Sequence, residues 1–318
     1  MNDLTTDLKI LQDETISNLN SSKAQNTIRA YKSDFKNFSL FCLKHGFQSM
    51  PSKPGTISLY LTYLSKSGTK ISTLRRRLVS LGVIHRIKGY YLDTKHPIII
   101  ENLLGIKRSK GSYQIGKKPI LINHLKKLIQ TINEDKSPDI KKLRDKSLIL
   151  IGFSGGFRRS EIVSLDYEDL EFVDEGLKII VRRSKTDQFG EGQLKGIPYF
   201  SDPLLCPVST LKQWFNISKI NSGPIFRKFH KGFNLSSIRL SDQTIALIIK
   251  NYLEKVGIDS KNYSGHSLRS GFATVTAEAG ADERSIMNMT GHKSTEMVRR
   301  YIKEANVFKN NALNKVKL

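Results

Sequence analysis

An arginine and a glutamate that follow a glycine turn in the second half of the chain could orient one another to act on an anion. The turn is Gly155-Gly156-Phe157, and Arg158 and Glu161 follow it three positions apart. Residues at this spacing share one face of a helix, so the carboxylate can hold the guanidinium in one orientation. Alone the pair is a weak signal, because Arg–Glu pairs are common on helix surfaces.

Two histidines, a second arginine and a tyrosine follow farther along the chain. His266 and Arg269 lie one helical turn apart, Gly291-His292 closes the next helical segment, and Tyr301 comes nine residues after His292. Each has an ordinary explanation: a capping histidine, a surface arginine, a solvated helix end and a core tyrosine. Each of these explanations is plausible alone, but the occurrence of all four residues in this order is not explained by them.

This ordered set of side chains resembles the signature of the tyrosine recombinases, the phage-integrase family. Within that family the chain is most similar to the simple two-domain members of the Cre and Xer type. Lys185, in a predicted hairpin, matches the family's strand-borne lysine. The resemblance covers the whole C-terminal block in order and spacing, and extends more weakly through the basic N-terminal block. The motif selects Arg158, although Arg159 beside it leaves a one-residue ambiguity.

The resemblance implies DNA strand exchange without metal, nucleotide or other cofactor. Tyr301 would attack a backbone phosphate, form a 3′-phosphotyrosyl bond and expel the 5′-hydroxyl, which later attacks a partner's phosphotyrosine. The bond energy stays in the covalent intermediate, so no ATP is required. The sequence contains neither a P-loop nor the spacing of a metal-ligand cluster, which agrees with such a reaction.

The resemblance also implies a role for each side chain. Two guanidiniums would offer planar forks of donors to the non-bridging oxygens, where negative charge grows. A carboxylate would orient the first guanidinium, a lysine would protonate the leaving oxygen, and the histidines would assist proton removal from the tyrosine or hold the phosphate. The catalytic candidates are Arg158, Lys185, His266, Arg269, His292 and Tyr301, with Glu161 in support.

The charge of the chain indicates a partner that is densely negative. Its 318 residues carry 52 Lys and Arg against 29 Asp and Glu, a net charge of +23. Nucleic acid fits this charge, and an anionic membrane surface fits it less well, because the bases do not lie opposite one apolar stripe. The longest apolar stretch is too short to cross a bilayer. Two distant cysteines without a CxxC pair favour a reducing, cytoplasmic compartment.

Charge and composition predict how the chain is divided, and the resemblance implies the catalytic role of the last block and the oligomerisation role of its tail. Residues 1–22 are an acidic lead-in, 23–106 a basic helical DNA-binding domain, 107–118 a basic linker, and 119–318 a catalytic domain with a C-terminal oligomerisation tail. Ordinary surface charge explains any single base in the first half about as well as DNA binding does. The bases predicted to contact DNA phosphates are Arg75, Arg76, Arg77, Lys107, Arg108, Lys110, Lys117 and Lys118.

Hydrophobic periodicity predicts a mainly α-helical protein. Apolar residues at three- and four-residue steps predict helices over 27–42, 57–64, 74–87, 98–104, 122–132 and 143–153, and again from 242 onward. Residues 178–183 and 196–200 predict strands of a small antiparallel hairpin sheet. With the resemblance, the expected fold is a helical, SAM-like core-binding domain followed by a mixed α+β catalytic domain.

The expected partner is double-stranded DNA with an inverted-repeat recombination site. The resemblance implies a tetramer on two such sites, in which Val307, Phe308, Leu313 and Val316 dock on a neighbouring subunit; the alternative for this segment is a frayed terminus. Two other functions stay open. One is a DNA-binding protein that keeps the fold without catalysis, against which the filled catalytic positions argue. The other is a DNA-relaxing enzyme of the type IB topoisomerase kind, against which the compact basic N-terminal block argues.

Overall fold

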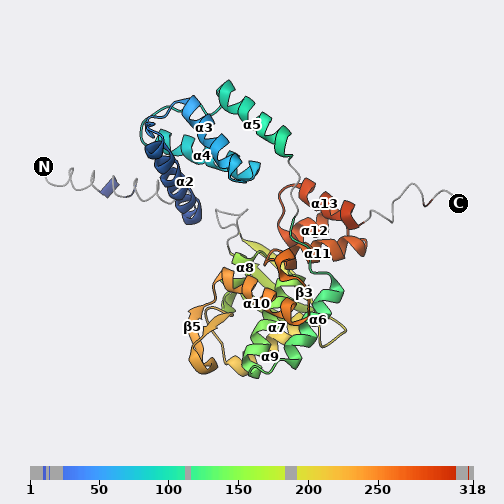
Figure 1. Ribbon diagram of the computed structural model, residues 1–318. Helices are drawn as coiled ribbons and strands as arrows, with labels where there is room; N and C mark the ends of the chain where they lie inside the picture. The colour runs from blue at the N-terminus through green and yellow to red at the C-terminus, as the bar shows by residue number, and fades with distance from the viewer. Residues whose placement is uncertain are drawn as a thin grey trace. The chain divides into compact units, whose positions relative to one another are not determined.

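The computed structural model describes residues 24–111, 116–182 and 192–305, together with the isolated residues 10, 11, 14 and 314. The chain separates into two compact units, Met1–Ile115 and Gly116–Leu318 (Figure 1). Most of the predicted lead-in and all four predicted docking residues of the C-terminal segment lie outside the described residues. No described helix is both long and apolar enough to cross a lipid bilayer.

The N-terminal unit consists of helices whose apolar faces meet in one core, as the periodicity predicts. Phe38 and Cys42 lie one turn apart on the first of these helices and pack with Tyr60 and Leu81 from the next two. Removing such surfaces from water is the main term that stabilises so small a unit. The helices are α2 (Gln25–Lys44), α3 (Pro54–Lys66), α4 (Ile71–Ile87) and α5 (Pro97–Lys110).

The ends of these helices differ from the predicted ends in ways that the local chemistry explains. Pro54 and Pro97 stand at the first helical positions of α3 and α5, where proline's missing N–H costs nothing. α4 begins at Ile71 without a side-chain cap, three residues before the start of the predicted helix over 74–87. α5 continues to Lys110, so residues 107–110 of the predicted linker are helical.

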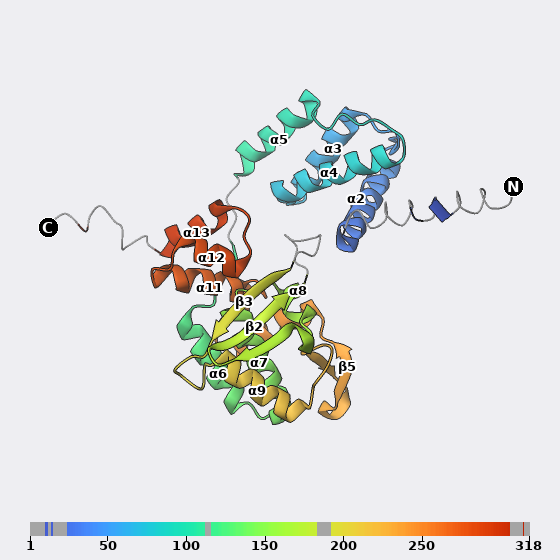
Figure 2. The ribbon, with the colours of Figure 1, turned by 180° about the vertical axis from the view of Figure 1, so that it is seen from behind.

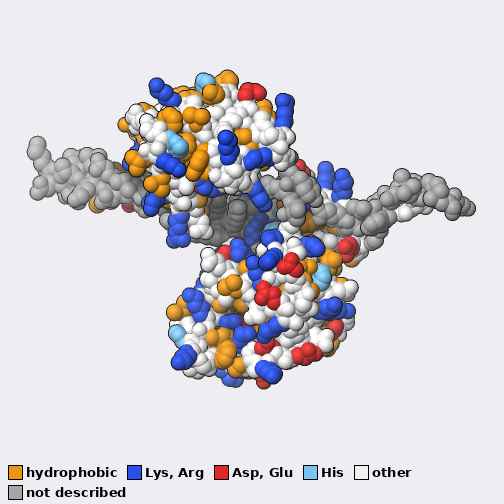
Figure 3. Space-filling model, viewed as in Figure 1, with side chains coloured by type: hydrophobic (Ala, Val, Ile, Leu, Met, Phe, Trp, Pro, Cys, Tyr) orange, Lys and Arg blue, Asp and Glu red, His pale blue; other side chains and the backbone are white. Residues whose placement is uncertain are grey.

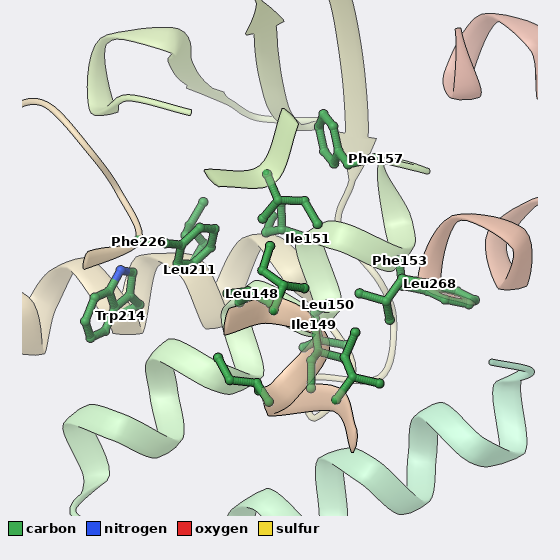
Figure 4. Close-up of a cluster of buried hydrophobic side chains, with 14 of the residues drawn as sticks. Leu148, Ile149, Leu150, Ile151, Phe153, Phe157, Leu211, Trp214, Phe226 and Leu268 are labelled. Carbon is green, nitrogen blue, oxygen red and sulfur yellow. The ribbon is translucent and has the colours of Figure 1, made fainter. Parts of the chain in front are cut away.

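The C-terminal unit surrounds one helix, α7, in which all the residues from 144 to 154 are buried. Residues 148–151 and Phe153 of α7 pack with Leu211, Trp214 and Phe226 (Figure 4). The indole N–H of Trp214 donates to the carbonyl of Ile225 at 2.8 Å, so this buried polar group is satisfied. The central helix is α7 (Asp139–Ser154), and the other helices of this core are α6 (Ile122–Glu134), α8 (Arg159–Ser164), α9 (Pro207–Ser218) and α10 (Asp242–Lys255).

A three-stranded antiparallel sheet contains the predicted hairpin. Its order is β1 (Leu170–Val173), β2 (Gly176–Val181) and β3 (Gln193–Pro198), with Ile179 opposite Lys195 (Figure 2). The predicted hairpin is confirmed, with its strands beginning two or three residues earlier. β1 and a second small sheet, β4 (Arg227–Phe229) with β5 (Leu235–Arg239), were not predicted, because strands this short carry too little alternation.

Three helices at the end of the described chain carry the last candidate residues. They are α11 (Ser267–Glu278), α12 (Glu283–Thr290) and α13 (Thr295–Ala305), and they lie together in Figure 1. Ala273 and Ala277 of α11 pack with Ile286, Val298 and Tyr301 in a small core of their own. The helical, α+β organisation predicted from the sequence is therefore confirmed.

Candidate active site

The turn after α7 places the first candidate arginine. Gly156 has a φ of 57°, in the left-handed region that favours glycine. A Cβ at this position would also lie 3.0 Å from the ring of Phe272. The turn redirects the chain, so that Arg158 becomes the N-cap residue of α8.

Glu161 holds Arg158 at two points. Its buried carboxylate accepts from the backbone N–H of Arg158 at 2.8 Å and from Nη1 at 2.6 Å. The Nη2 group donates to the carbonyl of Gly291 at 3.3 Å, which joins the arginine to the end of α12. Arg159 instead points toward Asp242 of α10, with 3.9 Å between the charged groups. The two adjacent arginines thus have separate partners, and Arg158 is the one oriented by Glu161.

Arg269 is the most deeply buried charged group of the cluster. Its side chain is 1% exposed, and its Nη1 donates to the carbonyl of Gly156 at 2.8 Å. Among the described residues, neither Nε nor Nη2 of Arg269 has a hydrogen-bond partner. Burial, and then the charge of Arg158, lowers the pKa of Arg269 to about 10. Two donors and a positive charge are therefore buried without full compensation.

His292 follows the left-handed Gly291 and is held by Thr290. Its Nδ1 lies 2.7 Å from the Thr290 hydroxyl, which also lies 2.6 Å from the carbonyl of Ile286. A helix threonine normally donates to that carbonyl, so its oxygen accepts from Nδ1–H, and Nε2 accepts when the ring is neutral and donates when it is protonated. Burial, followed by the charges of Arg269 and Arg158, lowers the pKa of His292 to about 4.

His266 is the N-cap residue of α11, one turn before Arg269. The surrounding protein, and then the charges of Arg269 and Arg158, lower its pKa although its side chain is exposed. Near pH 7 the ring is therefore neutral and able to accept a proton.

Tyr301 lies beside this cluster on α13. Its ring centroid is 6.3 Å from that of His292, and its side chain is nearly buried in the core of the last three helices. Together with His266, Ser270 and Lys117, it lines a cavity of about 230 Å³. Folding thus brings Arg158, Glu161, Arg269, His266, His292 and Tyr301 into one region of the C-terminal unit.

Two lysines follow β2 in the sequence, and only one of them lies within the described residues. Lys185, the predicted general acid, lies outside the described residues. Lys195, which the sequence analysis missed, is buried beside the cluster, and its Nζ donates to the carbonyl of Gly155 at 2.9 Å. The available signal was a lysine at the inward position of an alternating strand, next to inward Ile197.

The bases predicted to bind DNA have different surroundings. Arg75 and Arg76 are both exposed, but Arg76 pairs with Asp34, and the half-buried Arg77 donates to Asn37 and Tyr60. Lys and Arg side chains are spread over the visible face of each unit (Figure 3). The remaining predicted bases are all exposed, namely Lys107, Arg108, Lys110, Lys117 and Lys118.

Comparisons with known proteins agree with this arrangement. Residues 120–306 match the model of the phage integrase family. The chain is 41% identical over 301 residues to an integrase/recombinase XerD homolog of Selenomonas ruminantium, covering 94% of this chain and 87% of that protein.

Solved structures show the same fold. The XerH site-specific recombinase bound to a palindromic difH substrate aligns with a TM-score of 0.61 at 17% identity, covering 82% of this chain and 73% of that one. A lambda integrase from a tetramer bound to a Holliday junction aligns with a TM-score of 0.57 at 17% identity, covering 98% and 80%. With a family match over more than half of its length and a relative this similar in sequence, the chain belongs to the phage integrase family, the tyrosine recombinases.

Proposed function

We propose that this recombinase cleaves and rejoins double-stranded DNA at a specific site through a 3′-phosphotyrosyl bond to Tyr301. The observation that carries the proposal is the pair of buried Arg269 donors, Nε and Nη2, that find no acceptor among the described residues. Buried donors in folded proteins are normally satisfied. The non-bridging oxygens of a phosphodiester would satisfy them and would also compensate the charge.

The proposed reaction needs no bond energy from outside. The bond from Tyr301 Oη to phosphorus forms as the bond to the 5′-oxygen breaks, and negative charge grows on the non-bridging oxygens. Arg269, and Arg158 oriented by Glu161, would donate to these oxygens from positions that already exist before the reaction. A donor arranged in advance in this way is worth about 3–4 kcal/mol of transition-state stabilisation.

Two protons must move in this reaction. An unperturbed phenol has a pKa near 10, so attack by Tyr301 requires cationic neighbours that favour its ionised form. Neutral His266 shares the cavity with Tyr301 and would accept the phenolic proton. Lys185 would give a proton to the departing 5′-oxygen. His292 would donate to the phosphate from Nε2 once the phosphate charge has raised its pKa.

The proposed partner is a duplex with inverted repeats, bound by a tetramer on two sites. The net charge of +23 and the exposed bases of both units support the DNA partner. The lambda integrase structure with a similar fold is a tetramer on a Holliday junction, which supports the assembly.

The test is covalent attachment to DNA. A binding site is first selected from a random duplex library by its affinity for the Tyr301→Phe protein. The parent protein is then incubated with that duplex nicked near the expected cleavage point, so that the cleaved end diffuses away. We expect the parent to become linked to DNA and Tyr301→Phe to bind without linkage, while Tyr199→Phe, a partly exposed tyrosine of the same unit, behaves as the parent.

The alternatives predict other results. A protein that only binds DNA would give no linkage on the selected duplex, which would contradict the proposal. Linkage accompanied by relaxation of supercoiled DNA that lacks the site would indicate a DNA-relaxing enzyme instead.

A further inference from the structure

Lys195 is a lysine in a position where a half-buried strand usually has an apolar residue. Burial alternates along β3, and Lys195 faces inward together with Ile197. Its side chain is only 2% exposed. Burying an ammonium costs free energy unless hydrogen bonds and neighbouring groups compensate it, so its retention here calls for a specific explanation.

The partners of Lys195 lie in the turn that precedes Arg158. Its Nζ donates to the carbonyl of Gly155 at 2.9 Å and lies 4.2 Å from the ring centroid of Phe157, close enough for a cation–π interaction. The carbonyl between these residues, that of Gly156, accepts from Nη1 of Arg269 at 2.8 Å. Two cations therefore hold consecutive carbonyls of the Gly155–Phe157 turn, and Arg158 directly follows that turn.

The ammonium of Lys195 adds to an excess of positive charge that Arg269 and Arg158 already create. Arg269 and Arg158 oppose its protonation, and Glu161, the carboxylate that favours it, is already bound to Arg158. Burial is the largest cause and outweighs the carboxylate of Glu161; together with the charges of Arg269 and Arg158 it lowers the pKa of Lys195 to about 8. The lysine is therefore still mostly protonated near pH 7. The charge of Lys195 in turn helps to lower the pKa of His292.

We propose that Lys195 is a positioning residue for strand cleavage. By holding the Gly155–Phe157 turn, its ammonium places Arg158 and Arg269 so that both present their donors to the same phosphate. Because its amine is buried and bound to Gly155, it does not protonate the leaving oxygen, and that role stays with Lys185. The inference rests on the proposed function and deepens it.

The experiment compares two substrates. One is the selected nicked duplex, and the other is identical except that sulfur replaces the bridging 5′-oxygen at the cleaved phosphate. The departing thiolate needs no proton, because a thiol has a pKa near 8.5, far below that of an alcohol. The sulfur substrate therefore rescues the loss of a general acid and does not rescue misplaced guanidiniums.

We expect Lys195→Met to slow covalent attachment about a hundred-fold on both substrates, a loss typical of misplaced transition-state donors. Its dissociation constant for the duplex should change less than threefold. The attachment rate of Lys195→Arg, which keeps a charged donor, should lie within about tenfold of the parent rate.

Lys185→Ala should attach slowly to the oxygen substrate and at nearly the parent rate to the sulfur substrate. The control, Lys178→Met, removes an exposed lysine from the adjacent strand and should match the parent.

Several results would overturn the inference. A rate of covalent attachment by Lys195→Met within twofold of the parent rate would show that Lys195 has no role in cleavage. Recovery of that rate on the sulfur substrate would show that Lys195 is the general acid. Equal losses of binding and attachment would make its role merely structural. If Lys195→Met fails to fold, attachment is measured for Lys195→Arg and for Phe157→Leu, which removes the ring next to the amine. Attachment rates equal to the parent rate in both variants would reject the proposal. Absence of linkage by the parent itself would reject the proposed function, a distinguishable result.

Discussion

Arg76 in the N-terminal unit and Arg269 in the C-terminal unit are the same side chain in opposite situations. Both Nη groups of Arg76 donate to the buried carboxylate of Asp34, which also accepts from Ser80 at 2.7 Å. Arg269 has a carbonyl partner for Nη1, while its Nε and Nη2 have none among the described residues. A guanidinium whose donors the protein satisfies stabilises the fold, and one whose donors remain open is prepared for an external anion.

Arg77 is an intermediate case, because its buried Nε has no hydrogen-bond partner among the described residues and lies 3.6 Å from Oδ1 of Asp34, while its Nη1 is bound. It donates to Asn37 at 2.7 Å and to the Tyr60 hydroxyl at 2.6 Å, so it also ties α4 to α2 and α3. Of the run predicted to bind DNA, Arg75 and Arg76 are exposed, but the side chains of Arg76 and Arg77 are held by hydrogen bonds within the protein. DNA contact by these three residues stays a prediction, and the hydrogen bonds make Arg75 the better candidate.

The largest expected effect is the loss of cleavage rate when Arg269 is replaced. We expect Arg269→Lys to slow covalent attachment in preformed complexes by about a hundred- to a thousand-fold, because lysine keeps the charge but loses the planar fork of donors. Arg76→Lys should leave that rate unchanged, which makes it the matched control. A loss of less than tenfold for Arg269→Lys would show that the open donors do not serve the transition state.

An intermediate effect should appear in the stability of the N-terminal unit. Asp34→Asn leaves the guanidinium of Arg76 without its charged acceptor, and we expect it to lower the free energy of unfolding by about 2 kcal/mol. Urea denaturation of the full chain measures this change, and the attachment rate of preformed complexes should stay within threefold of the parent. If Asp34→Asn were as stable as the parent and slow in cleavage, the contrast between the two units would fail.

The smallest expected effect is a pH dependence that comes from the burial of His292 and, after that, from the charges of Arg269 and Arg158 beside it. The pKa of His292 is about 4 in the folded protein and near 6.5 when unfolded, so between these values the unfolded state binds the extra proton. Stability contributed by the neutral ring is complete above about pH 6.5 and is lost as the pH falls toward 4. Because the side chain is only partly buried, we expect a loss of about 1–2 kcal/mol.

Thermal or urea unfolding at a series of pH values measures this loss. His292→Gln should flatten the curve between pH 4 and 6.5, and bound duplex should do the same in the parent, since phosphate charge raises the pKa of the histidine. An equally steep curve in His292→Gln would assign the effect to other groups.

Periodicity predicted the long helices because each has an apolar face that recurs with the helical repeat. The run from Phe38 to Cys42 and the apolar stretch of α7 are examples, and both are buried as expected. Element ends were less predictable, as α4 shows, because several residues near a helix start can serve equally well. β1 and the β4–β5 pair escaped prediction because strands of three to five residues depend on pairing with distant neighbours.

By itself the sequence determined the order of residue types that marks the family and the helical character of both units, since these depend on residue identity and local spacing. Tertiary structure decided the rest: that Glu161 orients Arg158 rather than Arg159, that Arg76 is satisfied by Asp34, and that Lys195 is buried beneath the turn before Arg158. The physical reason is that hydrogen bonding and desolvation depend on contacts between residues that are distant in the sequence. Local spacing along the chain does not reveal which of these residues come into contact.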